Sequence, residues 1–207
     1  RRGMAYDPRM KRVVVGITGA SGAVYGIRLL ELLRRDAGVE VHLVASAAGK
    51  RTLVEETDNT LRQVEALAHV VYDDRDIGAS IASGSFRTAG MIVAPCSIKT
   101  LAALATCHAD TLIARAGDVT LKEGRPLLAL VREAPLHVGH LRQMLAFAEM
   151  GGIVFPPVPA FYQKPQTIDD IVGVYGERAP AVASSQTAFT AAFVVVSDRL
   201  LTEAEYT

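Results

Sequence analysis

The sequence has no tryptophan, only two cysteines, no excess of either charge and no long apolar run. These features exclude several classes of protein. The 22 Lys and Arg residues match 22 Asp and Glu residues, which gives no general electrostatic reason to bind nucleic acid or an anionic membrane. The longest apolar run, near Thr190–Val196, is far too short to cross a bilayer. Cys96 and Cys107 form no Cys-x-x-Cys pair and fall on elements expected to be buried. We therefore predict reduced core thiols in a cytoplasmic protein, without a redox centre or a zinc site.

At 207 residues the chain is long enough for one domain with a full core. We expect this domain over residues 11–207, and we expect residues 1–10 to be a disordered leader or a remnant of cloning.

Apolar runs alternate with helical patterns along this domain. The runs lack strict alternation, as is typical of strands covered on both faces, and they predict strands at Arg12–Ile17, Val39–Ala45, Met91–Ala94, Leu127–Val131 and Gly152–Phe155. A weaker run at His69–Tyr72 could add an edge strand. Helices are predicted at Ala23–Arg35, Thr60–Ala68, Thr100–Cys107, Asp110–Lys122, His137–Met150 and Thr167–Tyr175. This order predicts an α/β fold, a parallel sheet with helices on both faces.

Two segments interrupt the alternation. Asp74–Gly90 is rich in glycine and serine and long for a compact α/β unit, so it is a candidate lid. Phe155–Gln166 is rich in proline and leaves the last predicted strand at its carboxyl end. In an open parallel sheet, ligands bind at that end of the strands.

The turn Gly16–Gly22, with the sequence GITGASG, joins the first predicted strand to the first helix. Free backbone amides at a helix start attract anions, and glycine lets a ligand approach the backbone. An NAD site would also need an acidic residue at the end of the second strand, where this chain has Ser46, and no Tyr-x-x-x-Lys pair follows. The hydroxyl of Ser21 could instead reach a flavin, and a simple helix N-cap is the structural alternative.

Several motifs taken together are specific: PCSIKT, LKEGRPL, VREAPLHVGHL and PPVPAFYQKPQ. With the segments around them, from Lys11 to Arg178, they resemble the flavin prenyltransferases, the UbiX-like enzymes. The resemblance implies a flavodoxin-like, Rossmann-like sheet and a homododecamer. It also implies a metal-independent transfer of a dimethylallyl group from a prenyl phosphate, such as dimethylallyl phosphate, to reduced FMN. The product, prenylated FMN, would serve a UbiD-type decarboxylase.

The same resemblance assigns site residues. The catalytic residues it implies are Ser21, Glu56 and Glu133. The FMN-binding residues it implies are Gly19, Ala20, Ser21, Ser46, Ser97, Ile98, Lys99, Thr100 and Arg132. The residues it implies for the substrate phosphate are Arg115, Lys122, Tyr162, Arg178, Ser83, Gly84 and Ser85. These residue types suit the chemistry, because cations and hydroxyls stabilise a departing phosphate without a metal. A placed carboxyl group can move protons, particularly where burial raises its pKa.

Structural alternatives stand beside these assignments. Arg115 and Lys122 share a face of one predicted helix, and that face could simply be solvated. Arg132 and Glu133 could form a structural salt bridge, and Glu56 could only begin a loop. Separately, the pair His137-x-x-His140 has a spacing seen in metal sites, but it lacks the acidic residue of a zincin motif. We interpret it as a capping or interface feature.

The chain departs from the family pattern at three places. Gly124 stands where arginine is expected, which puts a surface or intersubunit contact in doubt. Ser46-Ala47 replaces Ser-Lys, which removes a cation beside the flavin site. The carboxyl-terminal segment differs most, and it leaves Arg178 and Arg199 as rival phosphate ligands.

Two other functions are compatible with the fold. An FMN-dependent cysteine decarboxylase would carry an Asn-x-x-Met motif, often followed by tryptophan, whereas this chain has no tryptophan and Asn59 is its only asparagine. A non-catalytic flavin-binding subunit is the other alternative. The sequence does not distinguish a monophosphate from a diphosphate donor.

Overall fold

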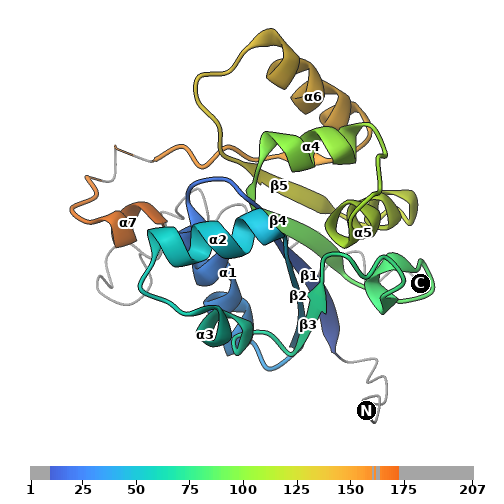
Figure 1. Cartoon of the computed structure of the whole chain (residues 1–207), viewed down its shortest axis with the longest axis horizontal. Coiled ribbons are helices and arrows are strands. Elements are labelled where there is room, and N and C mark those ends of the chain that lie inside the picture. The colour runs from blue at the N-terminus through green and yellow to red at the C-terminus, as the bar shows by residue number, and fades with distance from the viewer. Residues whose placement is uncertain (1–9, 160, 162–163, 173–207) are drawn as a thin grey trace.

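A parallel six-stranded sheet forms the centre of the computed structural model, which describes residues 10–159, 161 and 164–172 (Figure 1). The strands lie in the order β3-β2-β1-β4-β5-β6, and all neighbours run parallel. Their bounds are β1 Lys11–Ile17, β2 Val39–Ala45, β3 Val70–Asp73, β4 Gly90–Cys96, β5 Leu127–Val131 and β6 Ile153–Val154. The α/β prediction is confirmed, including the weak edge strand that becomes β3.

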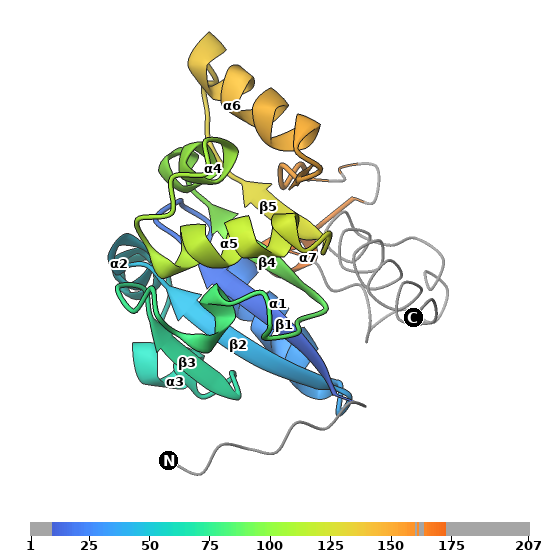
Figure 2. The same ribbon diagram turned by 90° about the vertical axis from the view of Figure 1, so that its right-hand side faces the viewer.

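Helices cover both faces of the sheet (Figures 1 and 2). On one face lie α1 Ala23–Arg35, α2 Ala47–Glu56 and α3 Leu61–Glu65, and α7 Ile168–Val172 packs against α1. On the other face lie the short 3-10 helix η1 Ser80–Ala82, α4 Ile98–Ala105 and α5 Leu112–Lys122. The helix α6 Val138–Glu149 packs on the outer side of α4, as Figure 1 shows.

The two faces of the sheet form two separate hydrophobic cores. Along β1, Val13 and Val15 point to the α1 side, whereas Val14 points to the α5 side, and all three are buried. Burying both faces explains why the strands read as continuous apolar runs without alternation. The prediction that these strands are covered on both faces is therefore confirmed by the side-chain packing.

One local prediction is wrong, and one helix was not predicted. The helix α2 was not expected, because its only buried positions are Gly49 and Leu53 and it has almost no amphipathic pattern. Cys107 is exposed at the end of α4, so only Cys96 is a core thiol. The candidate lid Asp74–Gly90 is anchored at one point, since Ile81 is buried in the core of the α5 face, and its movement stays a prediction.

The domain prediction lies partly outside the described residues. The described part, residues 10–172 with short gaps, shares one sheet. The leader at residues 1–10 and the extension of the domain to residue 207 stay predictions.

The close contact between α1 and β4 depends on Gly26. An ideal Cβ at this position would lie 2.4 Å from the carbonyl oxygen of Ala94, a backbone atom that cannot swing away. We expect Gly26→Ala to lower the free energy of unfolding by about 1–3 kcal/mol, as overpacking does in other cores. Urea denaturation measures the change. Gly78→Ala is the matched control, since its nearest atom would lie at 3.6 Å, and an equal loss in both variants would contradict the explanation.

Candidate active site

Four turns with polar residues meet at the carboxyl edge of the sheet. Gly19–Ser21 follows β1, Ser46 follows β2, Ser97–Thr100 follows β4, and Arg132 with Glu133 follows β5. Because the strands are parallel, their carboxyl ends share one edge, and β1 has its neighbours β2 and β4 on opposite sides. The chain therefore switches direction at β1, the place where ligands bind in such sheets. We call this set of residues, with Glu56, the carboxyl-edge cluster.

A buried threonine joins two of these turns. Thr18 is 0 % exposed, and its Oγ1 donates to the carbonyl oxygen of Pro95 at 2.9 Å. The same Oγ1 accepts the N–H of Ser97 at 2.8 Å, and the N–H of Thr18 donates to Pro95 at 3.1 Å. These three bonds fix the Gly19–Ser21 turn against the start of α4. Sequence reasoning missed Thr18, although a polar residue directly after an apolar strand was the available signal.

Two of the predicted flavin-binding serines are helix N-caps. Ser46 Oγ accepts from Gly49 N–H at 3.0 Å at the start of α2, and Ser97 Oγ accepts from Thr100 N–H at 3.3 Å at the start of α4. Each cap satisfies one amide and leaves others of the first turn free. Both helix starts therefore direct N–H donors and a positive dipole end toward the same edge.

The start of α1 is occupied by a carboxylate. Its N-cap is Gly22 and has no side-chain cap, so the N-cap interpretation of Ser21 is wrong. Instead, Glu56 Oε2 accepts from the N–H groups of Gly22 at 2.7 Å and Ala23 at 2.9 Å. Glu56 is the last residue of α2 and begins no loop. A ligand phosphate thus finds free amides at α2 or α4, whereas Glu56 already satisfies those of α1.

The environment of Glu56 favours its charged form. Burial raises the pKa of Glu56, but hydrogen bonds from Ser21, Ala23 and Gly22, together with the positive charge of Arg132, lower it more. The net pKa lies below the ordinary value, so Glu56 is a carboxylate at neutral pH. This is opposite to the raised pKa that the sequence argument favoured for a proton-moving carboxyl group.

Arg132 faces the same group of residues. Its charge lowers the pKa of Glu56 and opposes the burial that raises the pKa of Tyr25. Glu133 is exposed, and its Oε1 accepts the N–H of Ala134 at 3.1 Å. The charge of Arg132, just after β5, thus acts on residues of α1 and α2, and the neighbouring Glu133 stays exposed.

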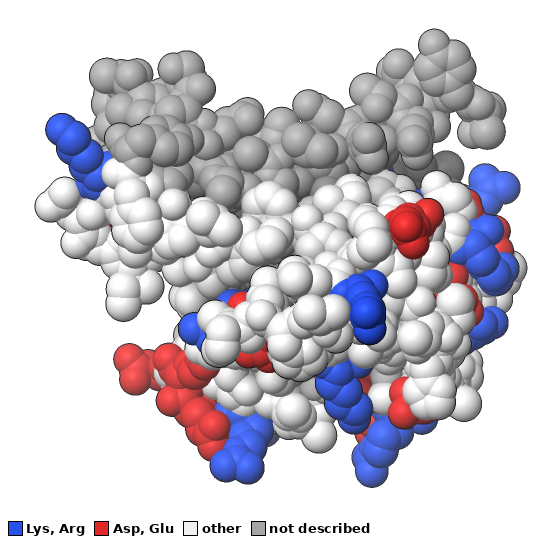
Figure 3. Space-filling view, turned by 90° about the horizontal axis from the view of Figure 1, so that it is seen from above, with Lys and Arg blue, Asp and Glu red and all other residues white. Residues whose placement is uncertain are grey.

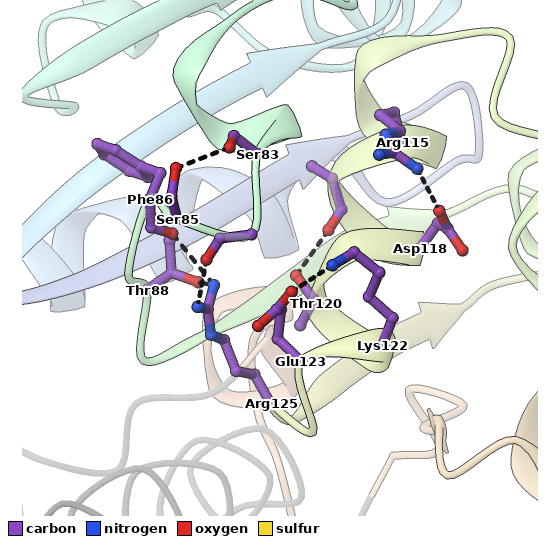
Figure 4. Close-up of polar contacts among 12 residues, drawn as sticks. Ser83, Ser85, Phe86, Thr88, Arg115, Asp118, Thr120, Lys122, Glu123 and Arg125 are labelled. Carbon is purple, nitrogen blue, oxygen red and sulfur yellow. Dashed lines mark hydrogen bonds and ion pairs between the residues drawn. The ribbon is translucent and has the colours of Figure 1, made fainter.

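A second cluster lies on α5 (Figure 4). We call it the α5 cluster, and it comprises Ser83, Gly84, Ser85, Arg115 and Lys122. An ideal Cβ on Gly84 would lie 3.0 Å from Lys122 Nζ, and the hydroxyls of Ser83 and Ser85 are 2.9 Å apart. Two predicted phosphate elements, the serine loop and Lys122, are therefore in contact.

Both cations of the α5 cluster have carboxylate neighbours. Arg115 Nη1 donates to Asp118 at 2.7 Å, and Lys122 pairs with Glu123. The hydrogen bond and the charge of Lys122 lower the pKa of Glu123. A substrate phosphate would have to compete with these carboxylates for the cations.

Within one chain, Lys122 and the Ser83–Ser85 loop lie toward the edge of the sheet opposite the carboxyl-edge cluster, whereas Arg115 lies in the first turn of α5. The start of α5 is at the carboxyl edge, because Leu112 N–H donates to the carbonyl oxygen of Asp74 just after β3. The end of α5 is at the amino edge, because β5 begins there and pairs Leu127 with Met91. A seven-residue strand such as β1 spans about 20 Å. The expectation that all candidate residues gather at strand ends and helix starts is therefore wrong for Lys122 and the serine loop.

Some predicted site residues cannot be placed. Tyr162, Arg178 and its rival Arg199 lie outside the described residues.

The histidine pair has a structural role. His137 Nδ1 accepts the N–H of Gly139 at 3.0 Å and caps α6, which confirms the capping interpretation. Its ring lies against that of His140, with centroids 3.6 Å apart. Within the described part of the chain, no three His, Cys, Asp or Glu residues are grouped so that they could hold a metal ion.

The helices of the described segments give no membrane anchor: none combines the length and the apolar character that a bilayer crossing requires.

The parallel sheet is covered on both faces and has anion-binding helix starts where the chain switches direction. This arrangement is typical of nucleotide-binding α/β proteins, and comparisons with known proteins identify the family. The flavoprotein family model matches residues 4–177. The flavin prenyltransferase UbiX of Escherichia coli strain K12 is 58% identical over 163 residues, which cover 79% of this chain and 86% of the relative.

Two solved structures support the same family assignment. AnUbiX (PadA1), in complex with FMN and dimethylallyl pyrophosphate, has a TM-score of 0.81 at 43% identity and covers 92% of this chain and 93% of its own. A dodecameric FMN-dependent UbiX-like decarboxylase from Escherichia coli O157:H7 has a TM-score of 0.77 at 51% identity and covers 78% of this chain and 88% of its own. The chain belongs to the flavoprotein family and, within it, to the UbiX-like flavin prenyltransferases.

The lowered pKa of Glu56 predicts a pH dependence of stability. A depressed pKa in the folded state gives stability that is present above the ordinary value of 4.5 and is lost as the pH falls through the folded value. We expect Glu56→Gln to lower the free energy of unfolding at pH 7, and we expect this difference to shrink toward pH 3. Urea denaturation at both pH values measures it.

Glu55→Gln is the control for this prediction. Glu55 is the preceding residue, is exposed, and pairs only on the surface with Arg51 at 2.7 Å. The capping role of Glu56 would be refuted if both variants lost the same small amount at both pH values.

Proposed function

We propose that this protein joins a dimethylallyl group from a prenyl phosphate to reduced FMN and so makes prenylated FMN. The observation that carries the proposal is the carboxyl-edge cluster, in which Ser21, Glu56 and Arg132 meet beside two free helix starts. The high identity to flavin prenyltransferases supports this activity over a cysteine decarboxylase. It also supports an enzyme over a non-catalytic flavin-binding subunit.

The carboxyl-edge cluster fits a phosphorylated flavin. The N–H groups at the starts of α2 and α4 suit its phosphate, and Thr18 keeps the Gly19–Ser21 turn in place below the ring. Ala47 leaves the start of α2 without the lysine that the family pattern has there, so backbone amides and Arg132 carry this role. When bound, reduced FMN supplies the electron-rich face that receives the allyl group.

The chain's residues then have distinct tasks. The hydroxyl of Ser21, hydrogen-bonded to the Glu56 carboxylate, holds a proton beside the proposed flavin site. The exposed Glu133 exchanges protons with solvent. When the allylic C–O bond breaks, its electron pair leaves with the phosphate, and Arg115 and Lys122 stabilise the new charge. We place Tyr162 and Arg178 with these phosphate ligands, on the strength of the family resemblance.

We infer that each site is completed by a second copy of the chain. Lys122 and the Ser83–Ser85 loop lie toward the edge opposite the flavin residues of their own chain, so a neighbouring copy would supply them, whereas Arg115 lies in the first turn of α5. Among the described residues, the face seen in Figure 3 is mostly uncharged, with basic and acidic groups scattered over it. The apolar side chains exposed on and beside α6 are Leu136, Val138, Leu141, Leu145 and Met150. A homo-oligomer, with the dodecamer of the related structure as its proposed form, would cover them.

Two further proposals concern the cell. The product would pass to a UbiD-type decarboxylase, which needs prenylated FMN. We place the reaction in the cytoplasm, where free thiols such as Cys96 and Cys107 stay reduced.

Prenyl transfer itself is the first test. We expect purified protein, incubated with reduced FMN and dimethylallyl phosphate, to yield a flavin heavier by one prenyl unit in mass spectrometry. Dimethylallyl diphosphate in a parallel incubation identifies the donor, and reactions lacking either the donor or the reductant are controls. A protein that binds FMN but never adds the prenyl group would be a flavin-binding subunit.

Subunit mixing tests the shared site. We expect Glu133→Gln to retain FMN and lose turnover, because it cannot exchange the proton, and Lys122→Gln to lose turnover with FMN binding unchanged. When both variants are co-expressed and assemble at random, about a quarter of the sites combine two intact halves, so activity returns.

The control for this mixing experiment combines two variants of the same cluster, Ser21→Ala and Glu133→Gln. These two variants cannot complement each other. If Lys122→Gln and Glu133→Gln also failed to complement, the site would lie within one chain. Full turnover by Glu133→Gln alone would remove Glu133 from the catalytic residues.

A further inference from the structure

We propose that Arg125 is a positioning residue for the prenyl phosphate: it fixes the Ser83–Ser85 loop beside Lys122 without touching the substrate. This inference rests on the proposed function, because it assigns a role to a residue behind the phosphate ligands.

Arg125 holds the backbone of the loop at several points (Figure 4). Its Nη2 donates to the carbonyl oxygen of Gly84 at 2.9 Å, and its Nη1 donates to the carbonyl oxygen of Phe86 at 3.1 Å. Nη1 also lies 3.4 Å from the hydroxyl of Thr88. The planar guanidinium suits this task, because it presents several donors in a fixed fork.

Besides Arg125, two local backbone bonds hold the loop, from Ser83 N–H to Ser80 and from Phe86 N–H to Ser83 at 3.1 Å each, and neither reaches α5. On one side, a chain of hydrogen bonds from the buried His42 to the exposed Ser80 fixes η1: His42 Nδ1 lies 2.9 Å from the hydroxyl of Tyr72, which lies 2.9 Å from Ser80 Oγ. On the other side, the Phe86 ring contacts His42 edge-on, with ring centroids 5.2 Å apart. Ser83 and Ser85 are exposed, and among the described residues Arg125 supplies the side-chain bonds that tie this loop backbone to the end of α5.

The end of α5 directs Arg125 to the loop. Gly124 has φ +67°, in the left-handed region that glycine adopts most easily, and its N–H donates to Leu121 at 2.9 Å. Arg125 N–H then donates to the carbonyl oxygen of Thr120 at 2.9 Å, which closes the helix end. The glycine that departs from the family pattern is thus the residue at which the chain turns, and Lys122 and Arg125 lie on either side of it.

Lys122 and the loop touch through Gly84. An ideal Cβ on Gly84 would collide with Glu123 Oε1 at 2.2 Å, so the loop lies directly against the last turn of α5. A loop released from Arg125 would separate its two serine hydroxyls from the Lys122 ammonium group. The phosphate would then lose hydroxyl donors and keep the cation.

The experiment compares Arg125→Gln and Arg125→Lys with the wild type in the prenyl transfer assay. Hydrogen bonds from a charged group are among the stronger ones, so we expect Arg125→Gln to raise KM for dimethylallyl phosphate about 10- to 100-fold. FMN affinity should stay within about twofold, since the FMN turns lie at the opposite edge of the sheet, and kcat should fall less than KM rises, since Arg115 and Lys122 still stabilise the departing phosphate. Arg125→Lys keeps the charge but loses the fork, and it should raise KM nearly as much.

Hydrogen exchange gives a readout that does not need activity. We expect amides over residues 83–88 to exchange faster in both variants without any ligand. Arg87→Gln is the matched control, since Arg87 is an exposed residue of the same loop that forms no ion pair within the described residues. It removes the same charge and should change neither KM nor exchange.

The outcomes separate the possibilities. Rescue of KM by Arg125→Lys with unchanged loop exchange would show direct charge contact with the phosphate and overturn the positioning role. A fall in kcat with KM unchanged would overturn it as well. Faster exchange in a protein whose wild type never prenylates FMN would refute the proposed function and leave Arg125 as a loop anchor only.

Discussion

The hydroxyl of Thr18 fixes the geometry on which the carboxyl-edge cluster depends. It lies where β1 meets β4, the pair of strands at which the chain changes direction across the sheet. By donating to Pro95 and accepting from Ser97, it makes one rigid unit of two turns that are far apart in sequence. A buried hydroxyl with both bonds satisfied has few alternative positions, so these two turns are preorganised.

The three helix starts at this edge bind different negative partners. The carboxylate of Glu56 satisfies the start of α1, and the starts of α2 and α4 keep donors for a ligand. The positive charge of Arg132 lies close enough to lower the pKa of this carboxylate and to act on Tyr25 as well. The charges within the cluster therefore position one another before any cofactor is bound.

Most of the fold could be predicted from the sequence, because strands buried on both faces leave continuous apolar runs. The helix α2 could not, since it buries only Gly49 and Leu53, and the N-cap Ser46 was its main signal. The family resemblance named the site residues, but it could not show that Lys122 lies toward the far edge, since that depends on the direction of α5. Thr18 and Arg125 escaped prediction for a related reason. Both act through bonds to backbone atoms distant in sequence, and no local pattern reports such bonds.

The acidic neighbours on α5 have a consequence for selectivity. Asp118 and Glu123 nearly neutralise Arg115 and Lys122, so the helix presents little net field to solvent. A small inorganic anion therefore gains little by displacing them, because each new contact replaces an existing one. An amphiphilic ester gains more, since its hydrocarbon tail is removed from water at the same moment. Discrimination against common cellular anions would thus come from the hydrocarbon tail of the ligand.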